Sequence, residues 1–81
     1  MKNIWIVHYT NKNEIDAFKS RENARQALID ECEDYYYFSS KEEKDTFIAE
    51  AIKEFNEEYK LNGRQFGIID IGYAEEIPLF D

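Results

Sequence analysis

The chain of 81 residues offers few of the side chains that enzymes use for nucleophilic or metal-assisted chemistry. It contains one histidine, His8, and one cysteine, Cys32. A single cysteine can form neither an internal disulfide nor a cysteine-based zinc site. His8 has no neighbouring serine or cysteine to activate, and the acidic residues around Cys32 disfavour its reactive thiolate. We therefore expect a protein that is not an enzyme and that needs no metal or cofactor.

Carboxylates are the one reactive group present in excess, and their densest run extends from Asp30 to Asp34. A calcium loop needs oxygen ligands at alternate positions and a glycine at its sharp turn, and this run contains no glycine. The segment Gly63-Arg64-Gln65-Phe66-Gly67 lacks the lysine and the following helix of a phosphate-binding loop. The acidic residues are therefore interpreted as a charged surface rather than as a catalytic or metal site.

The net charge of the chain is concentrated in one segment. The chain has 18 acidic residues against 10 lysines and arginines, a net charge of −8. Residues 30–58 hold 11 of the acids and 3 of the bases, so this segment accounts for the whole net charge. Such a balance argues against direct nucleic-acid binding, which needs a basic face. The sequence also has neither a membrane-spanning apolar run nor a signal-peptide core, so we expect a cytoplasmic protein without a membrane partner.

The residue pattern predicts three strands. Residues 4–9 are β-branched or aromatic and apolar on both faces apart from His8, which is typical of a strand at the centre of a sheet. Residues 14–18 follow a turn and are more polar, as expected for an edge strand. Residues 66–73 form the third predicted strand, with Ile69, Ile71 and Tyr73 on one face. Residues 75–81 are compatible with a short edge strand or an extended arm.

Two helices are predicted between the second and third strands. The first covers residues 21–34, with Ser20 as its N-cap. The second covers residues 41–61, begins at a capping box formed by Ser39 or Ser40, and ends before Asn62-Gly63. The second helix has the strongest apolar periodicity in the chain, through Phe47, Ile48, Ala51, Ile52, Phe55 and Tyr59.

These elements predict one α+β domain over residues 1–81 with the order β-β-α-α-β. We expect a three-stranded sheet in which residues 4–9 lie between the other two strands (order 2-1-3), with the third strand parallel to the first and a helical hairpin on one face. The all-antiparallel order 1-2-3 is the alternative.

The predicted binding surface lies in the acidic segment. On a helical wheel at about 100° per residue, four glutamates of the second helix form one outward stripe beside the apolar face. An adjacent run of tyrosines offers large contact area at low entropic cost. The predicted partner-binding residues are Glu33, Asp34, Tyr35, Tyr36, Tyr37, Glu43, Glu50, Glu54 and Glu57.

Residues 4–9 followed by Ala17-Phe18-Lys19-Ser20-Arg21-Glu22-Asn23-Ala24 resemble the opening of many small bacteriophage and prophage accessory proteins. The general character of the chain is similar to that of anti-CRISPR and other anti-defence inhibitors. The resemblance implies a small α+β fold, and no functional residue is transferred from it. Together with the charge map, it leads us to expect an inhibitor that imitates nucleic acid and blocks a basic, nucleic-acid-handling host protein such as a defence nuclease. The alternatives are an immunity or antitoxin-type partner of a basic toxin, and a non-catalytic phage structural or regulatory protein that forms a homodimer.

Overall fold

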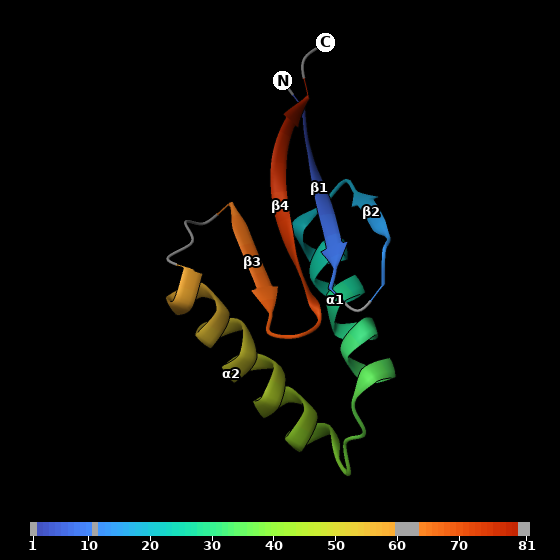
Figure 1. Ribbon diagram of the computed structural model, residues 1–81, viewed down its shortest axis with the longest axis vertical. Coiled ribbons are helices and arrows are strands. Elements are labelled where there is room, and N and C mark those ends of the chain that lie inside the picture. The colour runs from blue at the N-terminus through green and yellow to red at the C-terminus, as the bar shows by residue number, and fades with distance from the viewer. Residues whose placement is uncertain (1, 11, 60–63, 80–81) are drawn as a thin grey trace.

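The computed structural model describes residues 2–10, 12–59 and 64–79, which form a sheet and two helices (Figure 1). In chain order the elements are β1 (Lys2–Tyr9), β2 (Ile15–Phe18), α1 (Arg21–Tyr35), α2 (Lys41–Tyr59), β3 (Gln65–Ile68) and β4 (Gly72–Leu79). The predicted α+β class is confirmed, and both helices begin where they were predicted. Residues 60–63, including the predicted helix stop, and residues 80–81 lie outside the described residues.

The sheet has four strands in the order β2-β1-β4-β3, and all neighbouring pairs are antiparallel. The prediction of a three-stranded sheet is therefore wrong. β3 runs in the same direction as β1, as predicted for the third strand, but β4 lies between them, so the two do not pair. The central position predicted for residues 4–9 is confirmed, because β1 pairs with β2 on one side and with β4 on the other. The β1–β4 pair is continuous from Lys2 opposite Leu79 to Tyr9 opposite Gly72.

A tight turn interrupts the predicted third strand. The N–H of Ile71 donates to the carbonyl of Ile68 at 3.1 Å, and Asp70 has a φ of 69°. Aspartate adopts this left-handed conformation more readily than most residues, so the chain can reverse here without glycine or proline. Ile71 and Tyr73 were predicted to share one face of a strand. Instead, Ile71 is fully buried at the turn, whereas Tyr73 is exposed. The residues after the turn form β4, which is an inner strand rather than an edge strand or an arm.

One face of the sheet packs on α1 and forms the core. Alternate residues of β1 meet every fourth residue of α1 there, because these two spacings each place side chains on a single face. The centre of this core consists of Trp5, Val7, Tyr9, Ala24, Leu28 and Cys32. From the other half of the sheet, Phe66 packs against Trp5 with ring centroids 5.4 Å apart. Full burial of such side chains stabilises the fold by about 1.5–3 kcal/mol each.

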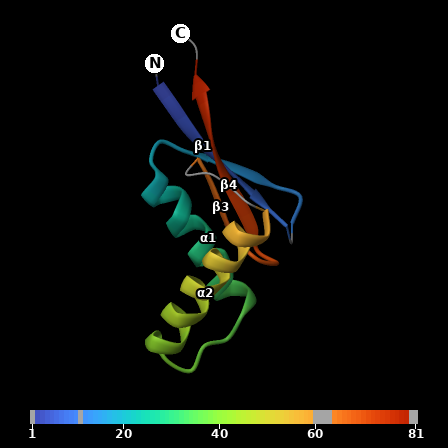
Figure 2. The ribbon, with the colours of Figure 1, turned by 90° about the vertical axis from the view of Figure 1, so that its left-hand side faces the viewer.

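Helix α2 lies along the outer strand β3 and does not share the position of α1. Figure 2 shows it crossing the sheet edge obliquely, with its first half on the side of α1. Ile48 and Ala51 in that half join the core. In the second half, the ring of Phe55 lies 2.7 Å from the position that a Cβ at Gly67 would occupy. The prediction that both helices cover one face of the sheet is thus correct for α1 only. Phe55 is half-buried at the border of the opposite face.

Both helices start at serine caps, as their sequences predict. The N–H of Asn23 donates to Ser20 Oγ at 3.1 Å, and the N–H of Glu43 donates to Ser40 Oγ at 3.1 Å. In a capping box the glutamate side chain bonds back to the N–H of the capping serine. Here the side chain of Glu43 accepts instead from the backbone N–H and the hydroxyl of Ser39, one residue before the cap. These caps satisfy donors that the first turn of a helix leaves unpaired.

Candidate protein-binding surface

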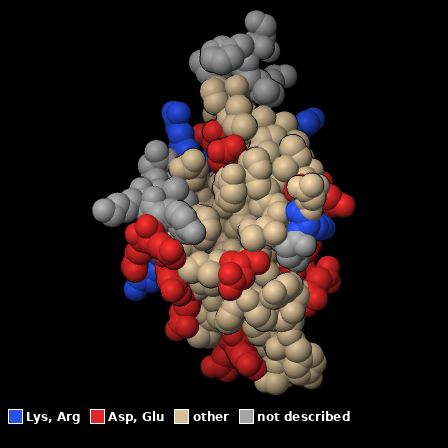
Figure 3. All heavy atoms as spheres, viewed as in Figure 1, with Lys and Arg blue, Asp and Glu red and all other residues tan. Residues whose placement is uncertain are grey.

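The exposed side of α2 is lined with glutamates. Ile48, Ala51, Ile52 and Phe55 turn toward the rest of the protein, so the glutamates between them are directed outward and are exposed. We call Glu50, Glu54 and Glu57 the acidic row. Figure 3 shows acidic side chains along the α2 side of the molecule, next to a central surface that is mostly uncharged. The outward stripe predicted from the helical wheel is present.

The acidic row differs in its pairing from several acidic residues elsewhere in the molecule. Some acidic side chains elsewhere are paired with cations: Lys12 pairs with Glu31 at 3.2 Å and Arg64 with Glu76 at 3.8 Å. Glu50, Glu54 and Glu57 form no ion pair with any residue that the structure describes. The charge of α2 is therefore directed at solvent or at a partner, rather than neutralised within the fold.

Two of the predicted binding residues have structural contacts. Glu43 accepts the hydrogen bonds of Ser39, and these bonds lower the pKa of its carboxyl group. Glu33 forms an ion pair with Lys44 across the two helices, with 2.6 Å between Oε1 and Nζ. This hydrogen bond raises the pKa of Lys44. Both glutamates are exposed, but they hold the start of α2 in place, which spacing along the sequence did not reveal.

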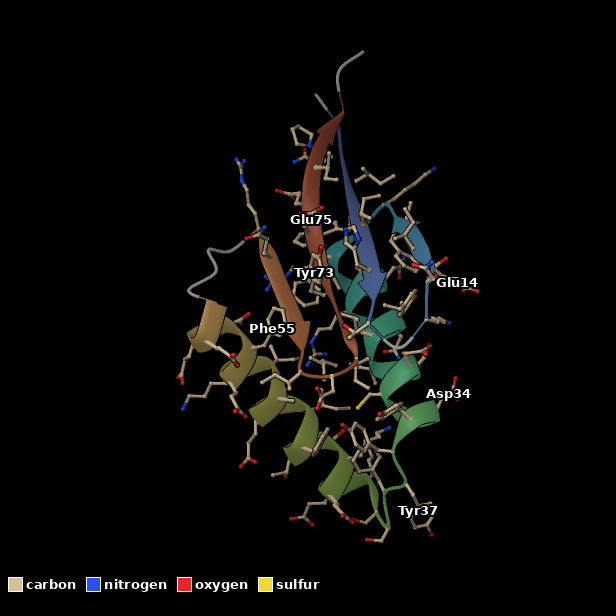
Figure 4. All side chains as sticks on the ribbon, viewed as in Figure 1. Glu14, Asp34, Tyr37, Phe55, Tyr73 and Glu75 are labelled. Atoms are coloured by element: carbon tan, nitrogen blue, oxygen red, sulfur yellow. The ribbon has the colours of Figure 1, made fainter. Side chains whose placement is uncertain are left out.

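Asp34 lies on a different side of the molecule from the acidic row, as its label in Figure 4 shows. It borders a hollow between β2 and α1 whose other lining residues include Tyr9, Asp16, Phe18 and Asp30. The hydroxyl of Tyr9 donates to Asp16 Oδ2 at 2.7 Å, and burial together with this bond raises the pKa of the phenol well above its ordinary value. The structure therefore does not bring Asp34 together with the α2 glutamates.

The tyrosine run alternates between exposed and packed rings at the end of α1. Tyr35 is half-exposed and Tyr37 is 92% exposed, and Figure 4 shows Tyr37 at the tip of the molecule. The ring of Tyr36 packs against Phe47 of α2 with centroids 5.0 Å apart. Phe38 packs against the same ring at 5.4 Å. Tyr36 and Phe38 thus close the helical hairpin, and only Tyr35 and Tyr37 are available to a partner.

The sheet face opposite α1 carries a surface that the sequence analysis missed. We call it the open face; its residues are Ile4, Ile6, His8, Ile15, Tyr73, Glu75 and Ile77. Ile15 is 63% exposed, and Tyr73 and Ile77 are each 37% exposed. In Figure 4, Tyr73 and Glu75 lie in front of the sheet, with Phe55 at one border. The sequence contained one signal for this surface. Residues 4–9 are apolar on both faces, but the predicted helices cover only one face of the sheet, so the other apolar face has to remain exposed.

A polar cluster lies in the middle of the open face. The rings of His8 and Tyr73 are stacked with centroids 4.5 Å apart and an interplanar angle of 14°. His8 Nε2 lies 3.2 Å from Glu75 Oε1, a hydrogen-bond distance. The histidine is therefore held by contacts on the sheet surface, and its nearest acid and ring come from β4.

Cys32 lies in the core between the sheet and α1. Cys32 is fully buried, and burial raises the pKa of its thiol. Within residues 2–10, 12–59 and 64–79, no group of three or more His, Cys, Asp or Glu side chains is arranged to hold a metal ion. None of the helices in this part of the chain is long and apolar enough to cross a membrane.

Among the described residues, the acidic row has no ion pair and the open face is not covered by a helix. Protein interfaces commonly combine an apolar centre with a polar rim. Comparison with protein-family models, with curated proteins and with solved structures found no match.

Proposed function

We propose that this protein is a binding inhibitor that attaches to a basic, nucleic-acid-handling protein through the acidic row of α2 and competes there with nucleic acid. The observation behind the proposal is that Glu50, Glu54 and Glu57 are exposed and lack ion pairs among the described residues. A basic surface that binds nucleic acid is built to receive a row of negative charges. The exposed Tyr35 and Tyr37 lie before the start of α2, at the opposite end of the helix from Glu57, and are not part of this proposed contact.

The energetics of the helix favour a binding role. Glu50 and Glu54, and Glu54 and Glu57, are four and three residues apart, so each pair of like charges costs an isolated helix about 0.2–0.5 kcal/mol. Lys53 lies at the flank of the row, three residues after Glu50 and four before Glu57, and offsets part of that repulsion. A basic partner would remove the remainder and would also accelerate association by electrostatic attraction at low salt.

The test is affinity capture from a bacterial lysate with the wild-type chain and with the double variant Glu54→Lys/Glu57→Lys. The matched control is Glu22→Lys/Asp30→Lys, which changes the net charge equally on exposed positions of α1. Captured proteins are eluted with duplex DNA at about 50 mM salt, and capture is repeated at about 300 mM salt, where charges are screened more strongly.

We expect the wild type and the control to retain the same basic proteins at low salt, and DNA to release them. The α2 variant should lose these proteins, with affinity for a purified one reduced at least about tenfold, or 1.4 kcal/mol. If the α2 variant retains the same proteins with the same affinity, the acidic row only keeps the protein in solution and the proposal is wrong.

A further inference from the structure

We infer that the open face binds an amphipathic basic helix of the partner, with the apolar side of that helix on β1 and β4 and its lysines or arginines directed at the acidic row and Glu75. This inference rests on the proposed function and assigns the partner segment that makes the contact. It is drawn from the exposure, the dimensions and the charge of the open face.

The exposure of the open face indicates a contact surface. Isoleucines contribute to it from three neighbouring strands, at Ile15 in β2, Ile4 and Ile6 in β1, and Ile77 in β4. Ile4 lies directly opposite Ile77, and His8 lies between Ile15 and Tyr73. Contiguous apolar groups on a sheet surface are more typical of a binding site than scattered single residues are. In Figure 3 the centre of the molecule is mostly uncharged, with acidic side chains among the apolar ones.

The dimensions of the open face match one helix. Adjacent strands lie about 4.8 Å apart, so β2, β1 and β4 together present a surface about 10 Å wide. A helix with its side chains is about 10–12 Å in diameter. From Ile4 to His8 the strand advances about 13 Å, a distance that a helix covers in about nine residues at 1.5 Å per residue. The second half of α2, with Phe55 over Gly67, borders this surface on the β3 side.

The charge around the open face selects a basic occupant. A second copy of this chain would bring another −8, and nucleic acid or an anionic membrane would be repelled in the same way. Glu75 lies within the surface, half-buried against His8. His8 contacts only Oε1 of Glu75, so a partner that covers this carboxylate removes water from its remaining acceptor sites, which is unfavourable unless a donor replaces that water. A lysine or arginine on the bound helix satisfies this requirement.

The probe is a synthetic helical peptide of about 18 residues built from leucine and lysine, with leucines along one side and lysines along the other, a length that covers the surface with margin. One control peptide has the same composition in an order that gives no apolar side, and a second has glutamate in place of lysine. Binding of the fluorescently labelled peptides to the full chain is measured by anisotropy, and the site is mapped by amide chemical shifts.

The variant that tests the open face is Ile15→Ser/Ile77→Ser. Its matched control is Tyr37→Ser, which removes the most exposed apolar ring from the distant tip of the molecule. We expect the amphipathic basic peptide to bind with shifts on β1 and β4, and the isoleucine variant to weaken binding at least about tenfold, as loss of two apolar contacts implies. The Tyr37 variant should bind like the wild type, and both control peptides should bind weakly. Circular dichroism establishes that each variant is folded.

The outcomes separate this inference from the proposed function. If Glu54→Lys/Glu57→Lys weakens peptide binding and Ile15→Ser/Ile77→Ser does not, the open-face site is wrong and the acidic-row proposal stands. If only the isoleucine variant weakens binding, the open-face site stands and the acidic row is not the partner's contact. Equal binding of the ordered and scrambled basic peptides overturns the amphipathic-helix assignment. The assignment is also overturned if the free protein sediments as a dimer and Ile15→Ser/Ile77→Ser abolishes that dimer. The open face is then occupied by a second copy of the chain.

Discussion

The two faces of the sheet are built from the same strands and yet have different roles. On the covered face, Val7 and Ala74 are fully buried and Phe66 is 2% exposed. On the open face, directly behind them, Ile6, Tyr73 and their neighbours remain partly exposed although their chemistry is almost as apolar. The difference arises from the position of the helices, since α1 covers one face and α2 crosses the edge. Apolar composition alone therefore does not identify the core of this protein.

Removing a large side chain from the covered face should have the largest effect on stability. Phe66→Ala should lower the free energy of unfolding by about 3–5 kcal/mol, because it deletes a buried ring in contact with Trp5 and leaves a cavity. Total stabilities of small domains are about 5–15 kcal/mol, so this variant should be close to unfolding. Urea titration followed by tryptophan fluorescence measures the loss. Phe55→Ala should cost less, because Phe55 is only half-buried.

Gly72 lies against the backbone of β1 where β4 begins, and its substitution should have the second-largest effect on stability. A Cβ added to this residue would collide with the carbonyl oxygen of His8, and the φ of 158° is unfavourable for other residues. Gly72→Ala should therefore destabilise the protein by more than about 1 kcal/mol. It should also shift the amide resonances of β1 next to His8. A Gly72→Ala variant with wild-type stability and wild-type shifts would contradict the close β1–β4 contact.

Polar substitution on the open face should have a small effect on stability. Ile15→Ser should change the free energy of unfolding by less than about 1 kcal/mol, because Ile15 is 63% exposed and loses little burial. The same urea titration measures it beside Phe66→Ala. A loss as large as that of Phe66→Ala would mean that the two faces contribute equally to the core, and the distinction between them would fail.

The smallest expected effect concerns pH and the start of α2, the helix that borders the open face. The hydrogen bonds from Ser39 lower the pKa of Glu43 in the folded state, so its contribution to stability is fully present above the unfolded pKa of about 4.3 and is lost as pH falls through the folded pKa. Glu43→Gln should remove this pH dependence. Melting temperatures measured between about pH 6 and pH 3 should fall less steeply for the variant than for the wild type. Parallel curves for the two proteins would show that Glu43 does not act in this way.

Sequence periodicity was sufficient to predict the helices and the central strand. Both helix starts follow from serine caps, and the inward positions of Ile48 and Ala51 follow from the 3.6-residue repeat. The β3–β4 turn could not be predicted in this way, because Ile69-Asp70-Ile71 has the composition of a strand and contains no glycine or proline. The missed turn caused the error in strand number and in the strand placed next to β1.

The binding surface was only partly predictable for a different reason. The outward direction of Glu50, Glu54 and Glu57 depends on one helix and follows from its own pattern. The contacts of Glu33 with Lys44, and the exposure of the open face, depend on how separate elements pack. No local pattern contains that information, so these features emerged only with the tertiary structure.

The pairing of Lys2 with Leu79 has a consequence for how the protein forms in the cell. The central β1–β4 pair joins the first and the last of the described strands, so β1 is synthesised well before β4. Domains commonly fold as their residues emerge, at about 5–20 residues per second, but here β1 has no β4 partner until nearly the whole described chain has been made. A newly made chain must therefore hold an apolar strand without its main neighbour throughout translation. Ribosome-associated chaperones would have their strongest influence on this protein before β4 has emerged.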